Sequence, residues 1–371
     1  MTKPRLPAIE YIRGISMLGV IGIHIGSQYL GSPVPNANLT ALYEIVTRFA
    51  VPIFFFISAF GIFYNMDPQK PFSYRSFIRR RAKAVLLPYM VWSLFYLYHD
   101  SILYHTGFPA IPYLADLLFF GNAKYHLYFL VILFWFYISM PLWYQILRKI
   151  NPIGLVILFF LQVGFNYFSS YDMDFIIWTY SLEDSFFKSL LLYRLNYLPL
   201  HYAFVFLIGG YAAMHIDEFL RILKDHQLTV SLFSFGSIIA LLHYYYSLMD
   251  GGYTQMDAIN TAHQLSPQGI VYTLAASFFF FMIFTYQHYP SCLNPIFSLL
   301  GRHSYFAYLV HPLFIGHYTL YLENHGIILT ASKSVLLYVV VLLSSILAAI
   351  LCRKFGSMVP YFNLCTIGTK K

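Results

Sequence analysis

Residues 9–30 read Ile9-Glu-Tyr-Ile-Arg-Gly-Ile-Ser-Met-Leu-Gly-Val-Ile-Gly-Ile-His-Ile-Gly-Ser-Gln-Tyr-Leu30, an apolar run that carries Arg13 and His24. As a helix, this stretch is long enough to cross a bilayer. Eleven positions separate the two basic side chains, so at about 100° per residue they share one face, about 16 Å apart along the axis. Ionisable groups at such depth normally face the interior of a bundle or a wet cavity. We therefore predict that the two side chains belong to a functional polar stripe. In the simpler alternative, Arg13 only extends its charged end to the membrane interface and His24 serves only in packing.

The composition indicates a membrane protein. Of 371 residues, 59% are hydrophobic and only 10% are charged, whereas charged residues make up about a quarter of soluble domains. We predict an all-α, polytopic helical bundle. The three cysteines have no spacing typical of a metal site or a disulfide framework, and no nucleic-acid partner is needed to explain the net charge of +8.

Apolar runs bounded by Pro, Gly, Asn and charged residues predict about ten membrane spans. They are 9–30, 41–64, 84–105, 124–147, 152–170, 199–216, 228–249, 268–287, 302–322 and 334–354. The first run has no small-residue cleavage site and is interrupted by Glu10 and Arg13, so we expect an uncleaved span. With no stretch long enough for a soluble domain and no solenoid repeat, residues 1–371 are expected to form one membrane domain.

The distribution of basic residues predicts the orientation. If the N-terminus lies inside, 18 of the 23 Lys and Arg residues fall on the inner side, as the positive-inside rule requires. The outer five are Arg48, Lys124, Lys188, Arg194 and Lys333. Both termini are therefore expected in the cytoplasm.

The usual hydrolase, metalloprotease and nucleotide-binding motifs are absent from the sequence. What remains is a set of basic side chains in or beside the spans: His24, Arg48, His126, His201, His243, His303 and His311. Histidine can accept a proton near neutral pH, and arginine can bind phosphate or carboxylate. These groups suit transfer of an activated group to a hydroxyl, and they suit a proton-coupled carrier equally well.

The second span adds Glu44 and Arg48, whose spacing of four allows an ion pair on one helix face. Pro52 follows and can kink the helix and open a cavity. An interfacial ion pair beside an ordinary proline kink would look the same.

A basic run, Phe77-Ile-Arg-Arg-Arg-Ala-Lys-Ala-Val-Leu-Leu-Pro-Tyr89, begins the third span. Clusters of this kind commonly anchor topology and contact anionic lipid. They also bind phosphate, so a polyanionic cytosolic donor is the functional alternative.

These segments together resemble the acyltransferase 3 family. The resemblance rests on ordered motifs that begin with Arg13-x10-His24, Arg48-Phe-Ala-Val-Pro-Ile-Phe-Phe-Phe-Ile-Ser58 and the basic run ending Pro88-Tyr89. It continues through Tyr125-His-Leu-Tyr-Phe-Leu130, Phe136-Tyr137 to Pro141, Phe206-Leu-Ile-Gly-Gly-Tyr211 and Leu300-Gly-Arg-His-Ser-Tyr-Phe-Ala-Tyr-Leu-Val-His-Pro312. Three positions depart from the family pattern: Ala59 replaces a glycine, Ala84 stands where a second arginine is expected, and Tyr128 replaces a tryptophan.

The resemblance implies a bacterial inner-membrane protein of about ten spans. Such proteins transfer an acyl group, commonly acetyl or succinyl, from the coenzyme A thioester to hydroxyls of surface glycans or related acceptors, with no further cofactor and no metal. The catalytic candidates are His24, Arg13, His126 and His311. The substrate-binding candidates are Arg48, Glu44, Ser58, Arg79, Arg80, Arg81 and Lys83.

In this interpretation Arg13 and the basic run bind acyl-CoA, His24 is a general base or relays the acyl group, and Arg48 and His126 lie toward the acceptor. His201 and His243 are expected to be structural. The alternative is a carrier that exports a glycan or small metabolite through the same polar groups, although no internal repeat typical of carriers is visible. The sequence leaves the oligomeric state open.

Overall fold

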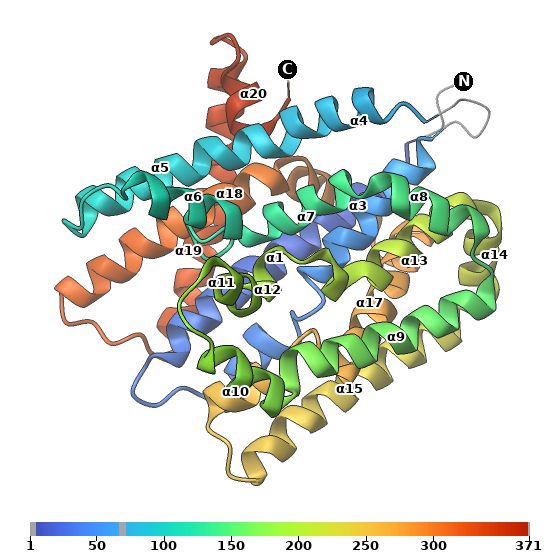
Figure 1. The fold of residues 1–371 in the computed structure, drawn as a ribbon, viewed down its shortest axis with the longest axis horizontal. Coiled ribbons are helices and arrows are strands. Elements are labelled where there is room, and N and C mark those ends of the chain that lie inside the picture. Colours follow the sequence, from blue (N-terminus) through green and yellow to red (C-terminus); the bar gives the residue numbers. More distant parts are fainter. Residues whose placement is uncertain (1–4, 67–71, 370–371) are drawn as a thin grey trace. The chain divides into compact units, whose positions relative to one another are not determined.

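The computed structural model describes residues 5–66 and 72–369, and in these ranges the chain is helical without strands (Figure 1). Lys3, Lys70, Lys370 and Lys371, which entered the predicted charge distribution, lie outside the described residues. The all-α expectation is confirmed. Backbone contacts divide the chain into two compact units, residues 1–66 with 205–350 and residues 67–204 with 351–371. These are called the first and second units below, and the expectation of one domain stays a prediction.

The first unit is built around α1, Pro7–Leu30, which packs against α18, α17 and α3. Apolar residues four positions apart on α1, Met17, Ile21 and Ile25, are fully buried, because this spacing places them on one helix face. The helices of this unit, including two that run past its limits, are α1, α2 (Ala37–Thr40), α3 (Pro52–Tyr64), α13 (Ala203–Met214), α14 (Ile216–Asp225), α15 (Gln227–Asp250), α16 (Gln255–Thr261), α17 (Pro267–Tyr286), α18 (Asn294–Asn324) and α19 (Ala331–Gly356).

The helices α1 and α18 run parallel and touch at their glycines. A Cβ atom added at Gly301 would lie 2.1 Å from the carbonyl oxygen of Glu10, and one at Gly14 would lie 2.9 Å from the Gly301 nitrogen. Contacts further along pair His24 with His311 and Ser32 with Leu329, so both helices advance in the same direction. Only glycine permits so close an approach of two backbones, and this contact sets which side chains meet beyond it.

The predicted span 41–64 is broken in the structure. It consists of a π-helical turn, Ala41–Ile45, then hydrogen-bonded turns over 46–51, and then α3 with Pro52 at its first turn. Proline has no N–H to bond the carbonyl four residues earlier, so the helix restarts at this point. The Tyr272 hydroxyl donates to the Val46 carbonyl oxygen at 2.7 Å, which satisfies one group that the break exposes.

The second unit contains shorter helices. They are α4 (Tyr74–Arg81), a π-helical turn (Ala82–Leu86), α5 (Leu87–Leu103), α6 (Ile111–Phe120), α7 (Tyr128–Ile138), α8 (Met140–Lys149), α9 (Pro152–Tyr171), α10 (Met173–Ser181), α11 (Phe186–Leu192), α12 (Arg194–Tyr197) and α20 (Phe362–Ile367). Short 3₁₀ segments occur at Pro199–Tyr202 in this unit and at Ser291–Leu293 in the first unit.

Five helices of the described residues are long and apolar enough to cross a membrane, namely α1, α9, α15, α17 and α19. The number rises to seven if two bent pairs count as spans, α7 with α8 at 63° and the pair 199–214 with 216–225 at 98°. On α15, Leu228, Leu232 and Ile239 are more than 60% exposed, which is typical of a face covered by lipid. The chain is thus a helical membrane protein, while the count of ten spans stays a prediction.

Candidate functional site

His24 and His311 form a stacked pair in the first unit. Their ring centroids lie 5.2 Å apart with an interplanar angle of 20°. His311 is fully buried and His24 is half-buried. The structure therefore brings together two of the four catalytic candidates, from α1 and α18.

Backbone carbonyls fix the tautomer of His311. Its Nδ1 lies 2.7 Å from the carbonyl oxygen of Tyr308 and 3.3 Å from that of Ala307. Because a carbonyl oxygen can only accept, Nδ1 must carry the hydrogen, and in a neutral ring Nε2 then holds the lone pair. The His311 ring is therefore held by the backbone of its own helix, and His24 stacks on a ring whose orientation and tautomer are fixed.

Arg13 lies on the same helix as His24 and is exposed. Helix α1 is unbroken from Pro7 to Leu30, so the eleven-residue spacing places both side chains on one face, as predicted. Near that end of the helix, the Glu10 carboxylate contacts Arg5 and accepts a hydrogen bond from the Ser298 hydroxyl at 3.0 Å. The end of α1 that carries Arg13 is thus tied to α18.

Glu44 and Arg48 form the ion pair that their spacing predicts. Arg48 Nη1 lies 3.6 Å from Glu44 Oε2, and the two side chains are only 7% and 3% exposed. Arg48 Nη2 donates to the carbonyl oxygen of Ile259 at 3.0 Å, while the Ser27 hydroxyl donates to Glu44 Oε1 at 2.9 Å. This buried pair therefore joins α1, three residues beyond His24, to the helix α16.

Ser58 lies half-buried on α3. The structure assigns it no hydrogen bond that links it to the histidine pair, so its substrate-binding role stays a prediction.

The four basic candidates near the start of the third predicted span lie in the second unit. Arg79, Arg80 and Lys83 are exposed, and Arg80 donates to the Ser76 hydroxyl at 2.6 Å. Arg81 is half-buried, with its guanidinium carbon 5.4 Å from the centroid of the Phe77 ring and 5.3 Å from that of Tyr137. The exposed three can meet a polyanion, and the aromatic contacts fix Arg81.

His126 also lies in the second unit, in the turn before α7. It is 2% exposed, and its ring stands edge-on to Tyr96 at a centroid distance of 5.6 Å. Nearby, Lys124 donates to Asp100 at 2.7 Å. His126 is thus a buried histidine within an aromatic and charged turn, in a different unit from the stacked pair.

His201, expected to be structural, joins a buried polar network in the second unit. Its Nε2 lies 2.8 Å from the Ser169 hydroxyl, and Arg194 donates to that same hydroxyl at 3.1 Å. Gln162 and Asn166 extend the network along α9. The spacing of positions 162, 166 and 169 at i, i+4 and i+7 is the sequence signal that indicates such a polar stripe.

The hydrogen bond from Ser27 to Glu44 could not be predicted from the sequence, because a serine in an apolar helix does not indicate which distant carboxylate it contacts.

Among the described residues, no group of three or more His, Cys, Asp or Glu side chains is placed to hold a metal ion.

Comparisons with known proteins place the chain in a family. Curated proteins of two Staphylococcus species are similar to this chain over most of their length, and they share the name "Probable poly-beta-1,6-N-acetyl-D-glucosamine export protein". The protein of Staphylococcus aureus (strain MRSA252) is 22% identical over 343 residues, covering 89% of each chain, and that of Staphylococcus epidermidis is 21% identical over 346 residues, covering 89% of this chain and 88% of the other. No solved structure matches the chain significantly. The profile of the acyltransferase 3 family, described as an acyltransferase domain, matches residues 6–354, and the chain therefore belongs to this family.

Proposed function

We propose that this protein is a membrane acyltransferase that moves an acyl group, acetyl or succinyl, from cytoplasmic acyl-CoA to a hydroxyl of an exported or surface glycan. The observation that carries the proposal is the stack of His24 on His311 within a chain of the acyltransferase family. The His24 imidazole stands on an apolar helix and stacks on the His311 imidazole, whose tautomer is fixed. An imidazole in this position is suited to take a proton from a hydroxyl.

In the proposed step His24 accepts the proton of the acceptor hydroxyl as its oxygen attacks the thioester carbonyl carbon. The new C–O ester bond forms, the C–S bond breaks, and the departing coenzyme A thiolate takes up the proton. General base catalysis typically supplies a factor of 10² to 10⁴, about 3–5 kcal/mol of the barrier. The remainder would come from positioning of the two substrates, to which His311 contributes by holding the His24 ring.

The donor would bind through its phosphates. Arg79, Arg80 and Lys83 are exposed in the second unit, so these three can meet the polyanionic part of acyl-CoA. Arg13 is exposed on α1 in the first unit, and its predicted contact with the donor is a separate part of the proposal. Coenzyme A is too highly charged to cross hydrocarbon unaided, so it would stay on the cytoplasmic side. This assignment requires a bacterial cytoplasmic membrane with both chain termini inside, which the distribution of basic residues favours.

The acceptor would be a glycan that contains N-acetylglucosamine. Support comes from the names of the relatives, which refer to a polymer of this sugar. The buried pair Glu44–Arg48 would support the acceptor side through Ser27. The role of His126 toward the acceptor stays a prediction from the sequence.

Export of the glycan itself is the second candidate, because the relatives are named as export proteins. Inside-out vesicles that hold a β-1,6-linked N-acetylglucosamine oligosaccharide in the lumen separate the two. Acyl-labelled acetyl-CoA or succinyl-CoA is added outside, and labelled ester on the lumenal sugar with free coenzyme A outside is expected. If oligosaccharide added outside is instead carried into the lumen and no ester forms, the transferase proposal fails and export takes its place.

A further inference from the structure

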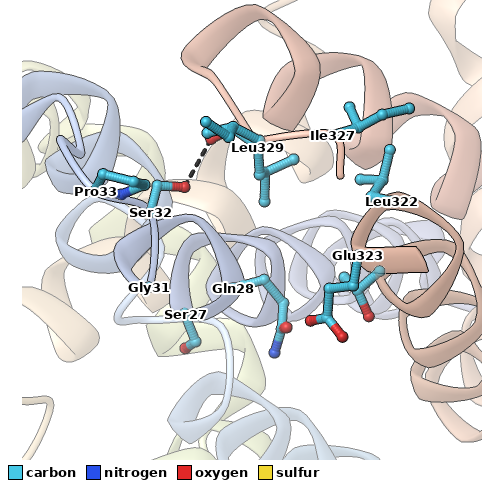
Figure 2. Close-up of a pocket in the computed structure, with 11 residues that line it drawn as sticks. Ser27, Gln28, Gly31, Ser32, Pro33, Leu322, Glu323, Ile327 and Leu329 are labelled. Atoms are coloured by element: carbon cyan, nitrogen blue, oxygen red, sulfur yellow. Dashed lines mark hydrogen bonds between the residues drawn. The ribbon is translucent and has the colours of Figure 1, made fainter. Parts of the chain in front are cut away.

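A pocket of about 350 Å³ lies in the first unit where the C-terminal end of α1 meets the end of α18 (Figure 2). Its volume is at the lower end of the range for small-molecule sites, about 300–1,000 Å³. The eleven residues that line it come from the two helix ends and the segments that follow them: Ser27, Gln28, Gly31, Ser32, Pro33, Thr319, Leu322, Glu323, Ile327, Ile328 and Leu329.

The pocket continues the helix faces that carry the histidine pair. Gln28 on α1 and Gly31, the residue that caps its C-terminal end, follow His24 by four and seven residues, so they lie within about 40° of its direction. Gln28 is about 6 Å further along the axis. On α18, Leu322 follows His311 by eleven residues and lies within about 20° of it. Because the two helices are parallel, both faces lead from the histidines to the pocket.

The lining combines hydrogen-bonding and apolar groups as a sugar would require. Gln28 can donate and accept, and Glu323 can accept. The Thr319 hydroxyl donates to the Ile315 carbonyl oxygen at 2.9 Å, so toward a ligand it can only accept. Leu322 and Ile327 offer apolar surface for the C–H face of a sugar ring. Figure 2 shows the Gln28 amide and the Glu323 carboxylate extending to the same side. Glu323 is the only charged residue among the eleven, so the lining carries no cation to match an anionic ligand.

Hydrogen bonds hold the walls in place. The Ser32 hydroxyl donates to the Leu329 carbonyl oxygen at 2.6 Å, and the Lys333 ammonium, on the first turn of α19, donates to the Ile328 carbonyl oxygen at 3.2 Å. On the other side, Ser27 is tied to the buried Glu44 carboxylate. A site whose walls are already fixed loses less entropy when a ligand binds.

We propose that this pocket binds one sugar unit of the acceptor glycan and prefers an uncharged or amino sugar over one that carries a carboxylate or phosphate. The proposal rests on the proposed function and assigns the acceptor subsite within it. A glycan that enters from this end would present its next hydroxyl toward His24, while the acyl donor approaches from the Arg13 end of the same helix. Glu323 would repel an anionic sugar, since no lining cation offsets its charge.

The test uses the purified full-length chain in lipid vesicles with acetyl-CoA and a trisaccharide of N-acetylglucosamine. Glu323→Gln and Gln28→Ala are expected to raise the KM for the trisaccharide at least tenfold, with the KM for acetyl-CoA unchanged. Gly31→Leu places a larger side chain in the pocket and narrows it. The backbone at position 31 (φ −73°) accepts a side chain, and a Cβ atom there would only touch the Gln28 carbonyl oxygen at 3.4 Å. Asp250→Asn is the matched control, an exposed acid at the end of α15 outside the pocket, and should leave both KM values as in the wild type.

Direct binding of the trisaccharide without acetyl-CoA, followed by saturation-transfer NMR, separates failure of this proposal from failure of the proposed function. The acceptor subsite is overturned if the wild type transfers the acyl group and all three pocket variants keep the wild-type trisaccharide KM and binding. The pocket is supported and the transferase is overturned if the pocket variants weaken trisaccharide binding while the wild type shows no transfer. A uronic acid trisaccharide that binds as tightly as the neutral one overturns the proposed selectivity.

Discussion

The hydroxyl of Ser27 donates to the carboxylate of Glu44 at 2.9 Å, and Glu44 in turn pairs with Arg48. Ser27 stands three residues beyond His24 on α1, and Arg48 bonds the backbone of Ile259. The buried Glu44–Arg48 pair therefore stabilises the position of α1 close to His24. The pair has this structural role in addition to any contact with substrate.

Replacing His24 with alanine should lower the rate of acyl transfer by about 10² to 10⁴-fold, because general base catalysis is lost. His311→Ala should lower kcat less, since it removes the ring that holds His24. The measurement is ester formation in vesicles with matched protein levels. His243→Ala on α15, an exposed histidine, is the control and should keep wild-type activity. Normal turnover in His24→Ala would return this histidine to a packing role.

Glu44→Ala should destabilise the protein by about 3–5 kcal/mol, because it leaves the Arg48 guanidinium buried without its partner. The double variant Glu44→Gln with Arg48→Met removes both charges and should recover part of that loss. Reversible unfolding in mixed micelles gives the free energies. Equal stability of the single variant and the wild type would mean that the buried pair contributes nothing to the fold.

Gly301→Ala should impair both stability and transfer, because its Cβ would lie 2.1 Å from the Glu10 carbonyl oxygen and push α18 away from α1. Gly316→Ala on the same helix is the matched control, since a Cβ there meets nothing within 4 Å. This control should be neutral or stabilise by about 0.5–1 kcal/mol, the usual difference between Ala and Gly in a helix. Thermal unfolding and ester formation are the two readouts, and similar behaviour of both variants would argue against a tight helix contact.

Replacing Arg79, Arg80 and Lys83 together with glutamine should raise the apparent KM for acyl-CoA. The wild-type KM should itself rise with salt, and the triple variant should lose most of that dependence, because exposed charges are screened. Arg221→Gln, another exposed basic residue on the side expected to be cytoplasmic, is the control. An unchanged KM in the triple variant would leave these residues as topology anchors only.

Reporter fusions test the expected orientation. A reporter in the 250–267 segment and one at Lys371 should report opposite sides of the membrane, with the C-terminal one in the cytoplasm. The parallel course of α1 and α18 agrees with this scheme, in which they are the first and ninth spans. A shared side for the two reporters would refute it.

Several features of the fold could be predicted from the sequence because they depend on neighbours along the chain. The shared face of Arg13 and His24 follows from the repeat of one helix, and the Glu44–Arg48 pair from a spacing of four. Pro52 predicted an interruption of the second span. The sequence did not reveal that turns over 46–51 separate a π-helical segment from α3. The extent of a break depends on which distant groups satisfy the freed backbone, here including Tyr272.

The amino-acid sequence by itself determined the helical membrane class, the family and the face of α1 on which His24 stands. Only the tertiary structure decided that His311 stacks on that ring and that a pocket with Gln28 and Glu323 lies beyond it. The physical reason is the range of the interactions. Helix periodicity and burial are fixed by residues a turn or two apart, whereas the meeting of α1 with α18 depends on the close approach at Gly14 and Gly301, which sequence spacing does not encode.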